Sequence, residues 1–304
     1  MGIIEKAGGE LHELATIRQD KEKKRKVEKR LAKKSARVKT FDLNFSALEK
    51  AGLYHPSGSS TQLALELRAV KRRLLRRIGF LRAAGERQAF CAPGRQRNLI
   101  LVTSTCAGEG KSFNAANLAL SLALEDQIET LLVDADILRP KVRSLLGLPK
   151  GPGLTDKFMD ITVKTKSLMR RANQAPLTVI GEGAAVDRVP ELFASDASQH
   201  FWAELSSAAS DRLIIIDAPP VLAATEAVIL AKYVDEVVFV VGANSTPESA
   251  VASAMDELLD INPNVSLLLN RCIIGSGGSH YRSYEYYGRE VRNEEMGGAI
   301  HAQT

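Results

Sequence analysis

The feature that most constrains the fold is a glycine-rich turn that joins an apolar run to a helix. The run NLILVTST, residues 98–105, is apolar and β-branched, which is typical of a buried strand. The turn GEGKS follows, and it opens a segment with helical periodicity from about Lys111 to Leu124. A strand that feeds a helix through a short glycine turn is the building unit of α/β proteins, so we expect strands and helices to alternate.

The alternation continues to residue 272 and defines the fold class. Apolar runs predict further buried strands at TLLVDAD (130–136), LTVIGEG (177–183), LIIIDAPP (213–220), EVVFVVGA (236–243) and VSLLLNRC (265–272). Helical segments separate them, including one near Pro190–Ala209. This pattern predicts an α/β fold, a doubly wound and mostly parallel sheet of P-loop NTPase type with flanking helices.

Composition changes along the chain suggest three parts. We expect a basic helical arm and linker at 1–60, which ends in the breaker run HPSGSS. A main domain at 61–275 begins with a basic amphipathic helix over 61–82, and a flexible tyrosine-rich tail spans 276–304. No apolar run reaches the length of a membrane span, and three scattered cysteines fit neither a disulfide framework nor a zinc site.

The glycine turn predicts a phosphate-binding loop. In STCAGEGKS, residues 104–112, glycines let consecutive N–H groups face a phosphate, Lys111 reaches the outer phosphates and Ser112 offers its hydroxyl to Mg²⁺. The consensus glycine that opens such loops falls at Thr105, so a ligand-free turn is the alternative. The predicted nucleotide contacts are Ala107, Gly108, Glu109, Gly110, Lys111, Ser112 and Phe113.

Three carboxylates strengthen the prediction. Asp134 and Asp136 end one predicted strand, and Asp217 ends another. Ligands of such sheets bind beyond the carboxyl ends of the strands, so these side chains are expected to converge with Ser112 on Mg²⁺. The alternative for each aspartate alone is a helix cap.

These motifs resemble the bacterial tyrosine kinases, a P-loop family. Its patterns PGEGKS, LLVDADLRRP and IIIDTPP correspond here to AGEGKS, LLVDADILRP and LIIIDAPP. The family's C-terminal tyrosine cluster corresponds to HYRSYEYYGRE, and the resemblance covers residues 60–290. The segment FDLNFSALEKAGL near residue 41 is similar to the subgroup that works with exosortase systems.

The departures from the family pattern are local. Ala107 replaces a proline, Leu138 replaces an arginine with Arg139 one place later, and Ala218 replaces Ser or Thr. These changes retain the expected phosphate and metal ligands. The helix motif ExxRxxR requires Glu at Leu65, whereas this chain has Glu66, Arg68 and Arg72, which weakens the expectation of ring assembly through that helix.

The resemblance implies an ATP-dependent, Mg²⁺-requiring protein-tyrosine autokinase that regulates exopolysaccharide or capsule polymerisation and export. It implies that Lys111 is catalytic, that Asp134 or Asp136 takes the tyrosine proton, and that Asn270 reads the adenine edge. It also implies a homo-oligomer that phosphorylates in trans and a transmembrane chain-length-determinant protein as partner. The expected location is the cytoplasm, peripheral to the inner face of the plasma membrane.

The C-terminal tyrosines are the expected phosphate acceptors. Four of the six tyrosines lie within seven residues, at Tyr281, Tyr284, Tyr286 and Tyr287, in a segment with almost no apolar support. Composition therefore argues against a core role, and the alternatives to phosphate acceptance are a chance cluster or an aromatic patch. A tyrosine-rich tail that reaches a neighbouring subunit's ATP site suits phosphate acceptance.

The basic segment at 21–39 has eleven Lys and Arg against two Glu, which makes +9 against +5 for the whole chain. It is either a solvated arm or a contact for anionic lipid. It lacks interleaved aromatic residues, so no nucleic-acid partner is expected.

The second functional hypothesis is a ParA/MinD-like partition ATPase that acts as a nucleotide-switched binding module. The first lysine of that class falls at Cys106, which disfavours it.

Overall fold

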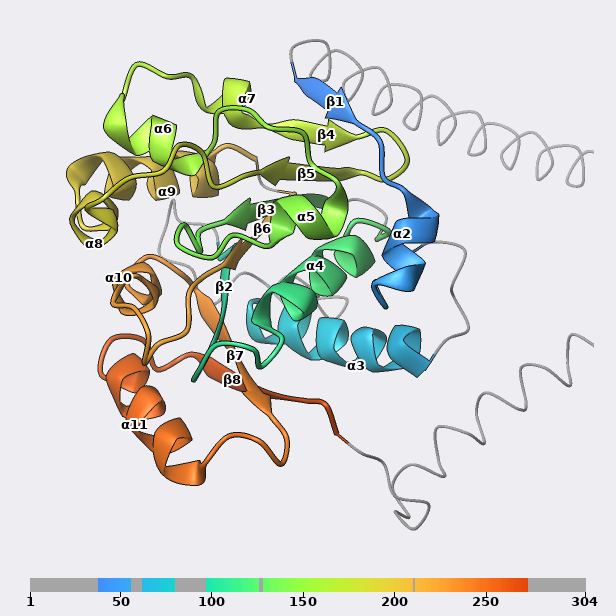
Figure 1. Ribbon diagram of the computed structural model, residues 1–304, viewed down its shortest axis with the longest axis vertical. Helices are drawn as coiled ribbons and strands as arrows, with labels where there is room; N and C mark the ends of the chain where they lie inside the picture. Colours follow the sequence, from blue (N-terminus) through green and yellow to red (C-terminus); the bar gives the residue numbers. More distant parts are fainter. Residues whose placement is uncertain (1–37, 56–61, 80–96, 126–127, 210, 273–304) are drawn as a thin grey trace, which may run out of the picture.

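One eight-stranded sheet organises the protein (Figure 1). The computed structural model describes residues 38–55, 62–79, 97–125, 128–209 and 211–272. The strand order is β1-β4-β5-β3-β6-β2-β7-β8. The strands are β1 (Lys39–Phe41), β2 (Leu99–Ser104), β3 (Glu129–Asp134), β4 (Arg170–Ala172), β5 (Leu177–Ile180), β6 (Arg212–Asp217), β7 (Glu236–Gly242) and β8 (Val265–Asn270).

Six of these strands are parallel, as the sequence predicts. β5, β3, β6, β2, β7 and β8 pair in parallel, and β4 pairs antiparallel with β5. β1 pairs parallel with β4, so the two strands form a reversed edge. The predicted fold class, a mostly parallel α/β sheet of P-loop type, is confirmed.

Helices cover both faces of the sheet (Figure 1). They are α2 (Phe45–Lys50), α3 (Gln62–Arg77), α4 (Lys111–Leu122), α5 (Val142–Leu146), α6 (Leu154–Met159), α7 (Thr165–Leu168), α8 (Val189–Phe193), α9 (Asp196–Ser207), α10 (Glu226–Ala231) and α11 (Glu248–Leu259). On one face α2 to α5 close an apolar core, and on the other face α6 to α11 close a second.

Side-chain alternation along the central strands supplies both cores. On β2, Ile100 and Val102 enter the core beneath α3 and α4, whereas Leu99 and Leu101 enter the core beneath α9 and α10. Successive residues of a strand point to opposite faces, so a strand covered on both faces must be apolar throughout. This requirement explains why the runs are continuous rather than alternating.

The prediction differs from the structure in two places. The expected single helix near Pro190–Ala209 is two helices, because the Ser195 side chain accepts a hydrogen bond from the Ser198 N–H and starts α9 afresh. The short edge strands β1 and β4 were not predicted, and β1 falls at the end of the expected helical arm. α2 also lies within the segment 1–60 that was expected to be a basic arm and linker. Residues 1–37 and 56–60 of that segment and the tail at 276–304 lie outside the described residues.

Candidate functional site

The glycine-rich loop has the backbone shape that anion binding requires. Gly108 and Gly110 have φ angles of 92° and 96°, a left-handed conformation that side chains disfavour. No atom lies within 4 Å of the position that a Cβ of Gly108 would take, so the loop opens on free space there. Within the described chain, none of the backbone N–H groups from 107 to 112 donates a hydrogen bond to the protein. These donors are free for an anion at the start of α4.

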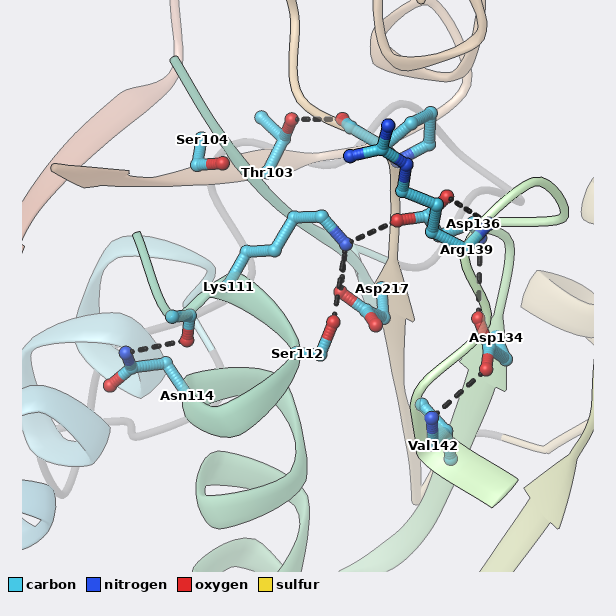
Figure 2. A network of polar contacts seen from close by, with 12 residues as sticks. Thr103, Ser104, Lys111, Ser112, Asn114, Asp134, Asp136, Arg139, Val142 and Asp217 are labelled. Carbon is cyan, nitrogen blue, oxygen red and sulfur yellow. Dashed lines mark hydrogen bonds and ion pairs between the residues drawn. The ribbon is translucent and has the colours of Figure 1, made fainter. Parts of the chain in front are cut away.

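Lys111 lies at the centre of the site (Figure 2). Its Nζ is 2.7 Å from Asp136 Oδ2, 3.4 Å from Asp217 Oδ1 and 3.2 Å from Ser112 Oγ. All four side chains are buried. Segments that are far apart in the sequence therefore bring one cation, two carboxylates and a hydroxyl together at the carboxyl ends of β2, β3 and β6.

Asp134 is close to this group but faces its own loop (Figure 2). The β3–β6 register sets Asp134 opposite Asp217. Its Oδ2 accepts a hydrogen bond from the Val142 N–H at 3.0 Å, and its Oδ1 accepts one from the Asp136 N–H at 3.3 Å. Asp134 thus fixes the path from β3 to α5, and with it the position of the Asp136 carboxylate.

The buried charged groups shift one another's pKa values. Burial raises the pKa of Asp217 to about 6, and the Lys111 ammonium opposes that rise. Burial and the charge of Asp217 raise the pKa of Asp134 well above its usual range. Burial disfavours the Lys111 ammonium, but Asp217, Asp136 and Asp134 outweigh it and raise the pKa of Lys111. The site is an electrostatically coupled cluster that keeps Lys111 charged.

A hydrogen-bond network that the sequence did not predict holds the glycine-rich loop against the end of β7. The Glu109 carboxylate accepts hydrogen bonds from the N–H groups of Cys106 at 2.7 Å and Gly242 at 3.4 Å, and from the Thr246 hydroxyl. Asn270 Nδ2 donates to the Glu109 carbonyl oxygen at 2.8 Å. A charged residue inside a glycine loop was the only sequence signal, and it does not reveal its partners.

The remaining predicted nucleotide contacts are placed as follows. Ala107 and Gly108 are exposed at the tip of the loop, whereas the Phe113 side chain packs against the core beneath α2 and α3. The Phe113 side chain is half-buried there. Asn270 lies against the loop through Glu109. Tyr281, Tyr284, Tyr286 and Tyr287 lie outside the described residues.

The residues present fit a nucleotide with its metal ion. Asp217 Oδ2 and Thr105 Oγ1 are buried and have no hydrogen-bond partner in the described part of the chain. An unpartnered carboxylate oxygen beside a hydroxyl and free loop N–H groups is a donor set that suits Mg²⁺ and phosphate. Among the described residues, no three His, Cys, Asp or Glu side chains can hold a metal ion by themselves. A metal here would therefore take further ligands from outside the protein, such as phosphate oxygens or water.

Comparison with known proteins agrees with this geometry. A family model described as ParA, NUBPL iron-transfer P-loop NTPase, matches residues 95–265. The tyrosine-protein kinase YwqD of Bacillus subtilis (strain 168) is 33% identical over 199 residues, which are 66% of this chain and 81% of YwqD. The tyrosine-protein kinase Wzc of Salmonella typhi is 27% identical over 67% of this chain, but that match spans only 28% of Wzc.

Solved structures are similar to this chain as well. The kinase domain of VpsO superposes with a TM-score of 0.54 at 30% identity, over 58% of this chain and 86% of that domain. The chimerical protein CapA2B2 superposes with a TM-score of 0.60 at 23% identity, over 78% of this chain and 95% of the chimera, which supports the fold alone. No helix of the described residues is both long and apolar enough to cross a membrane.

Proposed function

We propose, because the chain belongs to the bacterial tyrosine-protein kinases of P-loop type, that it is an ATP-dependent protein-tyrosine autokinase. The observation that carries the proposal is the convergence of Lys111, Ser112, Asp136 and Asp217 beside a loop whose N–H groups are free. Phosphoryl transfer depends mainly on positioning and on neutralising charge, and this cluster offers both.

Each residue has a distinct task in the proposed reaction. The loop N–H groups hold the phosphate chain, and Lys111 turns from the carboxylates to the outer phosphates. Ser112, Asp136 and Asp217 would hold Mg²⁺, which neutralises phosphate charge when bound, and Asp134 would support them from behind. The tyrosine oxygen attacks the terminal phosphorus, the bond to the ADP oxygen breaks, and a carboxylate receives the hydroxyl proton.

Asp136 is the better candidate for the proton acceptor. Asp134 has no exposed surface, and both of its oxygens already accept backbone hydrogen bonds. Asp136 is bound to Lys111, and that ion pair opens when the lysine turns to a phosphate. Asp136 Oδ1 accepts a hydrogen bond from the Arg139 N–H at 3.2 Å, so its Oδ2 is the oxygen that this opening would free for the tyrosine proton.

The biological setting follows from family membership and is part of the proposal. The acceptors would be Tyr281, Tyr284, Tyr286 and Tyr287, phosphorylated in trans within a homo-oligomer. A transmembrane chain-length-determinant protein would be the partner, and the kinase would work in the cytoplasm at the inner face of the plasma membrane. Its role would be to regulate exopolysaccharide or capsule polymerisation and export.

A ParA/MinD-like nucleotide switch is the second candidate, favoured by the family model that matches residues 95–265. That class needs a lysine at the position of Cys106, whose side chain is exposed at the loop. A thiol cannot supply that positive charge to a partner subunit's phosphate. The kinase proposal therefore explains the loop better.

The discriminating experiment is mass spectrometry of the purified chain after incubation with MgATP. We expect phosphotyrosine at 281–287, its loss in Lys111→Met, and its retention in Lys232→Met, which removes an exposed lysine at the far end of α10. Changing the four tail tyrosines to Phe should remove the label and retain ATP binding. A folded Lys111→Met chain that still labels would exclude this loop as the active site, and a wild-type chain that hydrolyses ATP without labelling would favour the nucleotide switch.

A further inference from the structure

No strand of the described part of the chain pairs with the outer edge of β8, where Cys272 Sγ makes a weak contact to the Leu269 carbonyl oxygen at 3.7 Å. β8 ends the sheet and pairs only with β7 there. The carbonyl oxygens of Asn264 and Asn270 accept hydrogen bonds on the β7 side. Along a parallel strand, the backbone N–H and C=O groups of successive residues point alternately to one neighbouring strand and to the other side. The backbone groups of Val265, Leu267 and Leu269 therefore point away from β7. This edge can accept another strand.

Two leucines make the same strand apolar on one face. Leu267 and Leu269 are each 61% exposed, although their neighbours on β7, Phe239 and Val241, are buried and half-buried. Residues two apart on a strand share a face, so the leucines form one apolar strip beyond the area that α11 covers. An open edge with exposed leucines is a surface for strand addition.

The opposite edge of the sheet, formed by β1, is not an open apolar edge of this kind. β1 has three residues, and its exposed Lys39 is the kind of side chain that blocks edge pairing. β8 has six residues, VSLLLN, without a charge, a proline or a bulge. The chain therefore protects one edge and leaves the other ready for a partner.

We propose that the tyrosine-bearing segment 279–288 of the same chain docks on β8 as an antiparallel strand. The chain leaves β8 at Arg271, whose φ of 60° turns the backbone away from the strand direction. The glycines at 275, 277 and 278 follow and permit a reversal. Thirty-two residues follow Cys272 (304 minus 272), and β8 is only about 20 Å long, so the tail can run back along it.

The segment has the chemistry that this edge requires. In SHYRSYEYYG, Tyr284 and Tyr286 are two residues apart, as are Leu267 and Leu269, so their rings can cover the leucine strip. Arg282 and Glu285 balance in charge. Aromatic residues favour strands, and a short glycine-rich tether corresponds to an effective concentration of about a millimolar.

Docking gives the acceptor tyrosines a resting position, and this consequence rests on the proposed function. The Asn270 end of β8 touches the phosphate loop at Glu109. An antiparallel segment runs from that end towards Val265, so it carries the tyrosines away from the site. Each added phosphate brings about −1.5 to −2 charges next to leucine side chains, which favours release. Phosphorylated tails would therefore not dock on β8.

The test is hydrogen exchange of the full, unphosphorylated chain without ATP. We expect the amides of 281–287 to exchange about tenfold more slowly in the wild type than in Leu267→Lys/Leu269→Lys, which equals a docked state about 1.4 kcal/mol more stable. The matched control Met159→Lys/Ile161→Lys changes the last residue of α6 and a residue just after it, which are 54% and 64% exposed, and it should keep the protection. Unchanged exchange in β2 and α4 verifies the fold of each variant.

Two results would overturn the proposal. One is equal exchange of 281–287 in the wild type and in the β8 double variant. The other is protection that falls on dilution, because that would assign the edge to the tail of a second copy. The release step is tested with Tyr284→Glu/Tyr286→Glu, which should exchange like the β8 variant. Failure to label with MgATP would count against the kinase alone, because the docking measurement uses no nucleotide.

Discussion

Gly110→Ala offers a quantitative test of how the loop is braced. Gly110 has a φ of 96°, and an added Cβ would lie 2.2 Å from Asn270 Nδ2. A left-handed alanine costs about 1–3 kcal/mol. Asn270 must also move, which removes its hydrogen bond to the Glu109 carbonyl, worth about 0.5–1.5 kcal/mol. We expect the free energy of unfolding to fall by about 2–4 kcal/mol.

A double-mutant cycle separates these two costs. Asn270→Ala alone removes the hydrogen bond and should cost about 1 kcal/mol. The double variant has no clash, so it should be about as stable as Gly110→Ala, with a coupling of about 1 kcal/mol. Gly147→Ala is the matched control, because Gly147 has a φ of 70° and no atom within 4 Å of its Cβ position. Its effect and that of Asn270→Ala should simply add.

Urea denaturation monitored by circular dichroism gives the four free energies of each cycle. Additive effects in the Gly110 cycle would refute the reasoning, because they would mean that Asn270 does not fill the space above Gly110. Equal losses for Gly110→Ala and Gly147→Ala would have the same meaning, since only the backbone cost would remain.

The remaining predictions concern the metal ligands and the basic arm. Asp136→Asn and Asp217→Asn should each lower autophosphorylation at least about tenfold and raise the Mg²⁺ concentration needed, because each removes a charge from the cluster while it keeps the side-chain shape. Asp256→Asn, on the exposed face of α11, is the control, and wild-type Mg²⁺ dependence in both site variants would disprove the carboxylate model. Replacing the Lys and Arg residues of 21–37 by Gln should leave ATP binding unchanged and weaken binding to anionic vesicles at low salt, where screening is least. The substitutions stop before β1, since truncation to residue 40 would remove two of its three residues. Equal vesicle binding by both chains would support a solvated arm.

The sequence predicted the parallel part of the sheet because buried strands must be apolar throughout. β1 and β4 were not predictable in the same way: each has three residues, and Lys39, Arg170 and Arg171 interrupt any apolar run. An edge strand is stabilised by its partner rather than by its own pattern. The break before α9 depends on a single serine cap at Ser195, which a periodicity argument does not register.

The site was predictable where strand ends determine it. Lys111, Asp136 and Asp217 converge because parallel strands end at one edge of the sheet. The orientation of Asp134 was not predictable, since it depends on the path of the loop to Val142. The same holds for Glu109, whose partners Gly242 and Thr246 lie at the end of β7 and in the loop after it, more than a hundred residues away.

The order of the strands also sets a distance between the two ends of the described chain. The chain enters the sheet at β1 and leaves it at β8, which are its opposite edges (Figure 1). Eight strands have seven gaps of about 4.8 Å, so roughly 34 Å separates entry from exit. An attachment on the N-terminal side of β1 would therefore hold the sheet by one edge, with the point where the chain leaves β8 at the opposite edge.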